Sequence, residues 1–519
     1  MASTGQTNPF EDPSSKDAQV QEQGEIARGT SEPQEPVPHT ATTLAVGRNA
    51  SLTLGTESLV VQDEELQQSG RVNCCGVSFA GKNKTTRSIP FYNILWAERS
   101  ENGDITIQYA HAVSKTVVRP AIISYTLDKP ESSEVEAWIE SLLDRAYGTS
   151  QRRKRIKMLV NPFGGQGGAV KMYHKHIAPI FAAAKCTLDM EKTQHNGHGT
   201  EIAQALDIDA FDVVACCSGD GIPHEVWNGL GKRADAARAL AKLAVTQLPG
   251  GSGNALSLNL NGTVSPSLAA LAVVKGLRTP LDLISVTQGD RRILSFLSQA
   301  VGIIAEADLG TEHLRWMGST RFTYGVIKRI LRQDVYPADI AIKVEHDNKT
   351  AIREVYRTEA SKSPPRHNER EIPPADLGLP PLRYGSVQDP LPDSWTLVPH
   401  DHLGNFYAGN LAYMSADANF FPASLPSDGC LDLVRMRGNL KRGAAIKALL
   451  AVAEHKFFDI EDVDYKKVTA YRIIPRNQKD GYIDIDGERI PFEPFQAEVH
   501  QGLGTVLSKS GHLFEAEGV

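Results

Sequence analysis

Three glycine-bearing turns carry polar residues in the middle of the chain, at residues 161–167, 218–221 and 249–254, and each directly follows a short apolar segment. Glycine lets the backbone approach a phosphate and adopt a positive φ, and the N–H groups at the start of a following helix attract anions. Because a tight strand-to-helix turn also needs glycine, one such turn alone would indicate little. Three of them in one sheet predict a binding site for a phosphate or a nucleotide.

Asp220 lies between two glycines in the second of these turns. A carboxylate alone would repel a phosphate, so its position suits a base that takes the proton of an attacking hydroxyl, or a group that holds Mg²⁺ beside the phosphates. The plainer alternative is an aspartate that caps the next helix. The chain lacks the P-loop and dinucleotide-binding glycine patterns, and it lacks the His-Arg-Asp and Asp-Phe-Gly motifs of protein kinases.

The elements around these turns alternate between strand and helix. Apolar segments at 156–160, 187–193, 212–217 and 245–248 are separated by stretches with a helical pattern. This alternation predicts an α/β domain over residues 151–280, with a parallel sheet covered on both faces. Ligands of such sheets bind outside the carboxyl ends of the strands, where all three glycine turns fall.

The flanking regions have other patterns. Residues 1–45 are rich in Ser, Thr, Pro, Gln and Glu, and we expect a disordered tail. Residues 46–150 combine short alternating strands with one helix that carries a central tryptophan, which is similar to the pattern of pleckstrin-homology (PH) domains. Residues 281–519 contain mainly β-type segments and predict a β-sandwich. A Pro-rich stretch at 348–397 interrupts that half, and we expect it to be a disordered insertion.

Composition excludes several classes of protein. The 519 residues include 55 basic and 62 acidic side chains, a net charge of −7, so we expect no nucleic-acid partner. The six cysteines form no Cys-x-x-Cys, and no apolar stretch reaches the length of a membrane span. We therefore expect a cytoplasmic protein with at most peripheral membrane contact. The basic residues Lys82, Lys84 and Arg87, and the run at 152–155, could contact anionic lipid or form a solvated surface. The sequence indicates no oligomeric state.

Three motifs occur together and in order: Ser-Gly-Asp-Gly-x-x-His-Glu-Val-x-Asn-Gly-Leu at 218–230, Asn-Pro-x-Gly-Gly at 161–165 and Pro-Gly-Gly-Ser-Gly-Asn-Ala at 249–255. Together they resemble the diacylglycerol-kinase-type lipid kinases, and among these the sphingosine (sphingoid long-chain base) kinases. The resemblance runs from about residue 156 onward, apart from the Pro-rich stretch. It implies an enzyme that uses ATP and Mg²⁺ to phosphorylate the primary hydroxyl of a sphingoid base such as sphingosine, sphinganine or phytosphingosine. ATP would lie between the two halves, and the lipid would enter a cavity in the second half.

The resemblance also implies roles for single residues. Asp220 would be the catalytic base, and Arg315 and Arg321 would neutralise the triphosphate, although taken alone these arginines could be ordinary surface residues. Phe163 departs from relatives, which have Arg at that position, and the 193–197 loop is poor in basic residues. The implied nucleotide-binding set is Asn161, Pro162, Phe163, Gly164, Gly165, Thr193, Gly197, Ser218, Gly219, Glu225, Arg315, Arg321, Asp486, Gly487 and Glu488.

Asp308 bears on which lipid is used, because it follows a nearly apolar run at 296–305. A sphingoid base has a protonated amine beside its reacting hydroxyl, and ceramide and diacylglycerol do not. A carboxylate at the mouth of the pocket would pair with that ammonium and would disfavour a neutral lipid. The resemblance implies this role for Asp308, and the plain alternative is a loop or helix-start carboxylate. The expected substrate-binding set is Asp308, Ser298, Gly221, Ile304, Phe322 and Val326, and the metal ligands stay unassigned.

Alternative functions have different signatures. A ceramide or diacylglycerol kinase of the same superfamily is the nearest alternative, and turnover of sphinganine against ceramide separates the two. A lipid-binding adaptor without catalysis would not need the intact Gly-Asp-Gly turn. A kinase for a soluble metabolite, such as a NAD kinase, would share that turn but would not need an apolar second half with Asp308.

Overall fold

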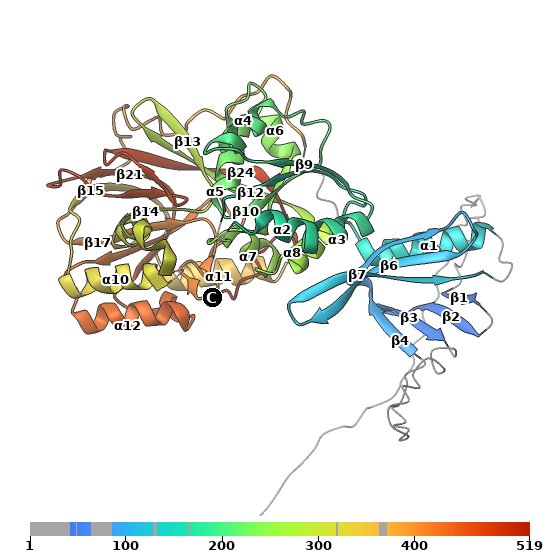
Figure 1. The fold of residues 1–519 in the computed structure, drawn as a ribbon. Helices are drawn as coiled ribbons and strands as arrows, with labels where there is room; N and C mark the ends of the chain where they lie inside the picture. Colours follow the sequence, from blue (N-terminus) through green and yellow to red (C-terminus); the bar gives the residue numbers. More distant parts are fainter. Residues whose placement is uncertain are drawn as a thin grey trace, which may run out of the picture. The chain divides into compact units, whose positions relative to one another are not determined.

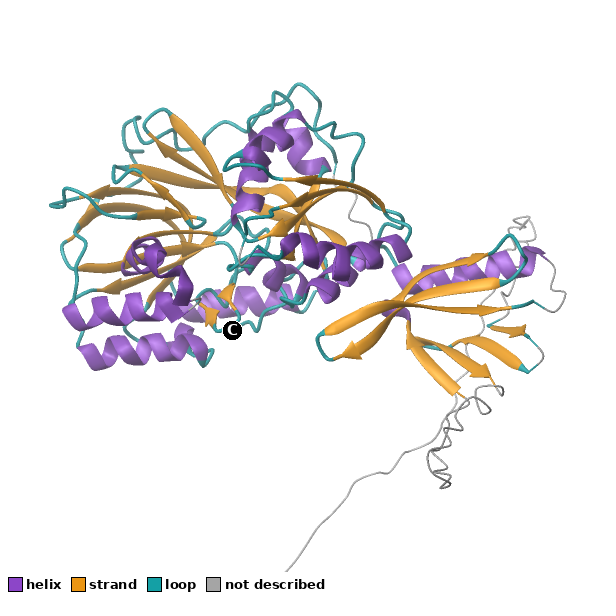
Figure 2. Ribbon diagram, in the orientation of Figure 1, coloured by secondary structure: helices purple, strands orange, loops and turns teal. Residues whose placement is uncertain are grey.

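The computed structural model describes residues 42–47, 49–63, 86–127, 132–164, 167–317, 320–362 and 371–519. Figures 1 and 2 show mixed helices and strands from about residue 150 onward and a mostly β region before it. The side chains of residues 132 and 315–317 lie outside the description. Residues 1–41, the greater part of the predicted tail, also lie outside it.

The N-terminal β region consists of two small antiparallel sheets and one helix, α1. The predicted apolar face of α1 is buried, and Trp138 is 1% exposed with its indole N–H donating to the carbonyl of Thr42. Strand β1 begins at Thr43, so the predicted tail was drawn a few residues too long. The elements are β1 (Thr43–Val46), β2 (Ala50–Leu54), β3 (Ser58–Asp63), β4 (Thr86–Pro90), β5 (Ile94–Arg99), β6 (Ile105–Ser114), β7 (Val117–Tyr125) and α1 (Ser132–Tyr147).

The basic run at 152–155 joins this region to the α/β half and is only partly exposed to solvent. Lys154 is 1% exposed and donates to the carbonyl of Val274 at 2.7 Å, while Arg155 pairs with Asp212 at 2.7 Å. Arg153 lies over the ring of Trp96. Lys154 therefore has a structural role, whereas Arg153 and Arg155 are exposed, and lipid contact by this run stays a prediction. Lys82 and Lys84 lie outside the described residues.

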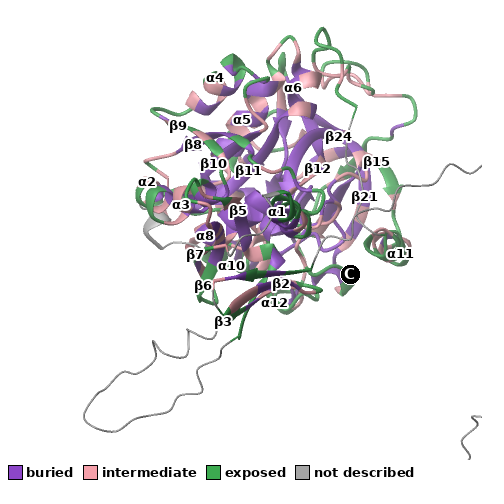
Figure 3. Ribbon diagram, turned by 90° about the vertical axis from the view of Figure 1, so that its right-hand side faces the viewer, coloured by how far each residue is buried: buried purple, intermediate pink, exposed green. Residues whose placement is uncertain are grey.

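The α/β half contains the predicted parallel sheet. Strand β8 pairs in parallel with β9 and β10, and β10 pairs in parallel with β11. Neighbouring side chains of β8 alternate between two apolar clusters, with Met158 in one and Leu159 in the other, so helices cover both faces of the sheet. Strands β8, β10 and β11 are buried, whereas β9 at the edge of the sheet is half-buried or exposed (Figure 3). The elements are β8 (Arg155–Val160), α2 (Ala169–Met172), α3 (Ala178–Ala183), β9 (Thr187–Lys192), α4 (His198–Ala205), β10 (Val213–Ser218), α5 (Gly221–Gly231), α6 (Ala236–Lys242), β11 (Ala244–Pro249), α7 (Ala255–Asn261) and α8 (Pro266–Lys275).

The second half is β-rich, as predicted, and its strand β24 connects it to the parallel sheet. Strand β24 pairs with β12 and β21, and at Val506 it pairs with Val245 of β11. The described strands of both halves thus form one branched sheet, apart from a short two-stranded sheet within residues 413–419, and a separate β-sandwich stays a prediction. The strands are β12 (Leu277–Gln288), β13 (Arg291–Ser295), β14 (Ser298–Gly302), β15 (Ala338–His346), β16 (Val398–His400), β17 (Leu403–Gly409), β18 (Tyr413–Ser415), β19 (Ala418–Asn419), β20 (Leu431–Arg437), β21 (Asp464–Pro475), β22 (Ile483–Ile485), β23 (Glu488–Ile490) and β24 (Phe495–Ser508). The helices are α9 (Ile303–Asp308), α10 (Thr320–Arg332), α11 (Lys349–Ala360) and α12 (Arg442–Ala453).

The Pro-rich stretch at 348–397 is not a disordered insertion in its described parts. It begins with helix α11, whose N-terminal N–H groups are capped by the side chain of Asn348. Farther on, buried side chains of the sheet bind its backbone, because Glu498 accepts the N–H groups of Arg383 and Tyr384. Trp395 is 5% exposed. The part after α11 lacks the alternation of a strand, and polar side chains of the sheet satisfy the backbone N–H groups of Arg383, Tyr384 and Val387 instead.

Candidate active site

The carboxyl ends of the parallel strands meet in one row. Val160 lies opposite Cys217 and Lys192, and Ser218 lies opposite Pro249, so the predicted turns follow neighbouring strands at the same edge. The turns after β10 and β11 pack so closely that a Cβ on Gly251 would lie 2.3 Å from the Cα of Gly219. These glycines are therefore required by the packing of the turns, and phosphate binding by the turns stays a prediction.

Asp220 is held by a helix other than its own. Its carboxylate accepts the backbone N–H groups of Ala255 at 3.0 Å and Leu256 at 3.1 Å, at the start of α7. It makes no side-chain cap on α5, the helix that follows it, so the predicted alternative is wrong for that helix. Burial raises the pKa of Asp220, and the two N–H groups offset only part of this effect. The result is an oriented carboxylate of increased basicity at the ligand edge of the sheet.

Two other predicted nucleotide residues hold loops at this edge. Both oxygens of Glu225 are occupied, because they accept the N–H groups of Gly197 at 3.0 Å and Gly199 at 2.7 Å. The side-chain oxygen of Asn161 accepts the N–H of Phe163, whose ring is 75% exposed. These contacts shape the loops after β8 and β9. They leave nucleotide binding by Asn161, Pro162, Phe163, Gly164, Thr193, Gly197, Ser218, Gly219 and Glu225 as a prediction, and Gly165 lies outside the described residues.

One group in the described ranges could hold a metal ion by geometry. His195, His198 and Glu201, at the start of α4, place their ligand atoms within 4.8 Å of one another. Imidazole nitrogens suit zinc-type ions, whereas Mg²⁺ prefers oxygen ligands. This group therefore does not fit the expected Mg²⁺.

The carboxylate of Asp486 forms its hydrogen bonds with donors of the protein itself. Its side chain is fully buried, with φ at +57°, and its carboxylate accepts five hydrogen bonds, which fix the turn between β13 and β14 and connect it to α5. The donors are Ser295 Oγ, the N–H groups of Phe296, Leu297 and Ser298, and Nδ1 of His224, at 2.7 to 3.0 Å. With every donor from the protein, Asp486 positions the two halves; its predicted nucleotide contact, and those of Gly487 and Glu488, stay predictions.

We expect Asp486→Asn to lower the free energy of unfolding by about 3 kcal/mol, because an amide cannot accept this set of N–H and O–H donors and leaves buried groups unpaired. Urea denaturation of the variant and the unmodified protein measures this loss. The control is Glu488→Gln, two residues away and exposed, which should change stability little. Equal stability of the Asp486 variant and the unmodified protein would contradict the structural role.

Asp308 and Arg321 form an ion pair. The guanidinium of Arg321 binds the Asp308 carboxylate at 2.8 Å and the Thr311 hydroxyl at 3.1 Å. The triphosphate role predicted for Arg321 requires that it leave this pair, so that role stays a prediction. The side chain of Arg315 lies outside the described residues.

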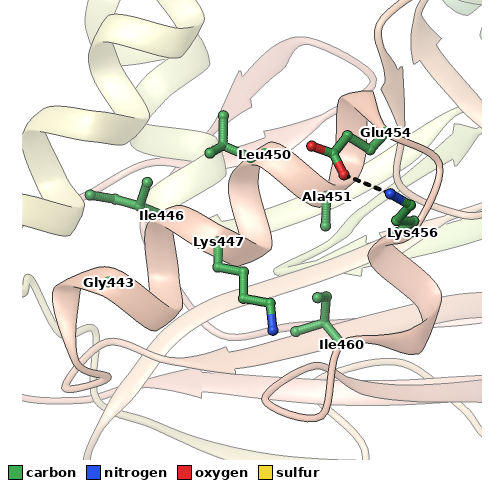
Figure 4. A pocket seen from close by; sticks show the side chains of 8 residues that line it. All are labelled: Gly443, Ile446, Lys447, Leu450, Ala451, Glu454, Lys456 and Ile460. Atoms are coloured by element: carbon green, nitrogen blue, oxygen red, sulfur yellow. Dashed lines mark hydrogen bonds and ion pairs between the residues drawn. The ribbon is translucent and has the colours of Figure 1, made fainter.

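The predicted lipid-binding residues come together in one apolar cluster. Ile304 and Val326 are buried in it, and Phe322 packs against it. Ser298 is 8% exposed on β14, and its side chain is hydrogen bonded to Tyr407, a member of the same cluster. A hollow along α12 (Figure 4) contains none of the predicted site residues. It is lined by Gly443, Ile446, Lys447, Leu450, Ala451, Glu454, Lys456 and Ile460.

Three buried or half-buried polar residues of this region were not predicted: His224, Gln247 and Asp484. His224 stands inside the Gly-Asp-Gly-x-x-His motif. Burial lowers its pKa, but the hydrogen bond to Asp486 and the negative charges of Asp486, Glu488 and Glu225 together raise the pKa above its ordinary value. Gln247 hydrogen bonds to Asp220 from β11. Asp484 lies on β22, two residues before Asp486. Because side chains alternate along a strand, this spacing was the only sequence signal that Asp484 lies near the predicted site.

Comparison with known proteins identifies the class. The family model described as the diacylglycerol kinase catalytic domain matches residues 155–286, and a domain of unknown function, DUF7493, matches residues 42–148. Sphingoid long chain base kinase 4 of Schizosaccharomyces pombe is 33% identical over 84% of this chain and 90% of its own length. Sphingoid long chain base kinase 5 of Saccharomyces cerevisiae is 35% identical over 77% of this chain, and the match spans 66% of the yeast protein. Human sphingosine kinase 1 is 29% identical over 70% of this chain and 92% of its own length.

This chain therefore belongs to the family of sphingoid long chain base kinases, and it is a kinase. Among the helices of the described residues, none is both long and apolar enough to cross a membrane.

Proposed function

We propose that this chain transfers the γ-phosphate of ATP to the primary hydroxyl of a sphingoid long-chain base. The observation that carries the proposal is Asp220, a basic, oriented carboxylate at the ligand edge of the parallel sheet. Asp220 takes the proton of the hydroxyl, the hydroxyl oxygen forms a bond to the γ-phosphorus, and ADP leaves with the electrons of the broken P–O bond. The names of the relatives support the same activity.

Mg²⁺ belongs to the proposal as the ion that neutralises the phosphate charge. It prefers oxygen ligands and keeps several waters, so the phosphate oxygens of ATP with one carboxylate suffice. Asp220 acts as the base, and both of its oxygens already accept N–H groups, so the carboxylate that holds Mg²⁺ stays unassigned.

Asp308 and the apolar cluster below it support a sphingoid base as the lipid. Asp308 keeps one face open to solvent, with 34% of its side chain exposed, and can pair with an ammonium group. The alkyl chain would pack against the cluster around Ile304, Phe322 and Val326, at about 0.8 kcal/mol per buried methylene. Assaying sphinganine and ceramide with radiolabelled ATP tests the assignment, and a preference for ceramide would favour the alternative lipid kinase.

Peripheral membrane contact and a PH-like fold for residues 46–150 are also proposals. A long-chain substrate resides in membranes, and α10 exposes Tyr324, Ile327 and Leu331 at 39–50%. Two sheets followed by one helix with the buried Trp138 support the PH-like interpretation. The alternative of a non-catalytic adaptor fails if the purified chain phosphorylates sphinganine.

The raised pKa of Asp220 predicts the acid side of the pH profile. The base must be deprotonated to act, so kcat should fall as the pH is lowered, with a midpoint above the ordinary pKa of an aspartate. Measuring kcat at saturating sphinganine across mildly acidic pH tests this. A kcat that stays level down to the ordinary aspartate range would contradict Asp220 as a base of raised pKa.

A further inference from the structure

Asp484 is a buried carboxyl that the proposed reaction does not yet use. It lies on β22 and is 6% exposed. Its Oδ1 accepts the N–H of Gly487 at 2.7 Å, and its carboxyl group is hydrogen bonded to the carboxyl group of Asp308. Asp308 is the residue assigned to the substrate amine, so Asp484 directly contacts the amine subsite.

The strand register also directs Asp484 toward the lipid. Asp484 lies opposite Ala300 of β14, and Ala300 lies opposite Tyr407 of β17. Directly opposed residues point to the same face of a sheet. Ala300 and Tyr407 are members of the apolar cluster that contains Ile304 and Val326. The side chain of Asp484 therefore faces the same layer as the residues proposed to bind the alkyl chain.

A hydrogen bond between two carboxyl groups requires a proton between them, because two carboxylates at that distance repel each other. The titratable and charged groups around this pair are Arg321 beside Asp308, Asp486 in the turn that follows the strand of Asp484, and the phenol of Tyr407. Asp308 is paired with the arginine, whereas the groups that act on Asp484 in the described residues are two other carboxyl groups and a backbone N–H. Burial first, and then Asp308, raise the pKa of Asp484 well above its usual range, so Asp484 holds the proton.

We propose that Asp484 is a second specificity-determining carboxyl of the amine subsite, and that the Asp308–Asp484 pair releases its shared proton when the ammonium group of the substrate binds. This inference rests on the proposed function. The ammonium enters with its three protons, the O–H bond of Asp484 breaks, and the proton leaves to solvent. Both carboxylates then face one ammonium and one guanidinium. A lipid without the amine supplies no positive charge to replace the proton and leaves the pair protonated.

The first experiment compares KM for a short-chain sphinganine in the unmodified kinase, Asp484→Asn and Asp480→Asn at about pH 6 and about pH 8. At about pH 8, the KM of Asp484→Asn should be about tenfold higher than that of the unmodified kinase. At about pH 6, the two KM values should be similar, because release of the proton by the unmodified kinase costs more free energy as the pH falls. Asp480, with 80% of its side chain exposed, is a matched control and should leave KM unchanged. A KM ratio independent of pH would reveal a merely structural role and would overturn the inference.

The second experiment counts protons, and its decisive measurement uses the unmodified kinase alone. Calorimetric titration of the unmodified kinase with the short-chain sphinganine, in two buffers of different ionisation enthalpy near neutral pH, should reveal proton release that Asp484→Asn lacks. Binding without proton release would overturn the inference. If the unmodified kinase phosphorylates sphinganine but releases no proton, this inference alone fails. If it does not phosphorylate sphinganine, the proposed function fails.

Discussion

Replacing Asp220 with asparagine is expected to lower kcat by about 10³-fold, because the amide cannot take the proton of the attacking hydroxyl. KM for sphinganine should change much less, since Asp220 lies at the sheet edge and the alkyl chain packs against a different set of residues. Turnover of radiolabelled ATP, measured with sphinganine in excess, gives both constants. Unchanged phosphate transfer would refute the assignment of Asp220 as the base.

Asp220→Asn also disturbs the two hydrogen bonds that the carboxylate accepts from α7, so a control for loss of stability is needed. Asp282 is another buried aspartate that accepts two backbone N–H groups, those of Gly429 and Gly502 at 2.6 Å each, away from the proposed site. Asp282→Asn should therefore destabilise the protein by a comparable amount and keep kcat for the folded fraction. If it lost as much kcat as Asp220→Asn, the loss at Asp220 would reflect folding and not catalysis.

Asp308→Asn is expected to raise KM for sphinganine by about 30-fold, while its effect on a neutral lipid should be small. The reason is that the substrate ammonium loses its carboxylate partner and meets the unpaired guanidinium of Arg321 instead. The ratio of kcat/KM for sphinganine to that for ceramide should fall correspondingly. An equal loss with both lipids would contradict a role in recognising the amine.

Glu306→Gln provides the matched control on the same short helix. Glu306 binds Arg329 at 2.7 Å, so its substitution also breaks an arginine–carboxylate pair. It should leave the preference between the two lipids unchanged. A changed preference in Glu306→Gln would mean that the packing of α9, and not the Asp308 charge, determines specificity.

Patterns among neighbouring residues correctly predicted the strands before the glycine turns and the helix α1. The strand before each glycine turn and the buried face of α1 follow from alternation and from the spacing of apolar residues, and both are present in the fold. The parallel arrangement follows because helices separate the strands, and the parallel arrangement in turn predicts Asp220 at the ligand edge of the sheet.

The contacts that connect distant segments could not be predicted. Nothing near Asp486 in the sequence indicates that donors from residues 295–298 and His224 occupy its carboxylate. The resemblance implies a triphosphate contact for Arg321, but it does not indicate the ion pair that Arg321 forms with Asp308. The 348–397 stretch was misjudged because its order depends on Glu498, more than a hundred residues later.

The position of β24 has a consequence for how the protein is made. This strand lies between β12 on one side and β11 and β21 on the other, yet the ribosome synthesises it after all of them. Until it emerges, the nascent chain exposes unpaired strand edges on both sides of a gap, and such edges invite aggregation. Biogenesis of this kinase should therefore depend on chaperones until β24 has left the ribosome, and a nonsense codon before Phe495 should yield insoluble product.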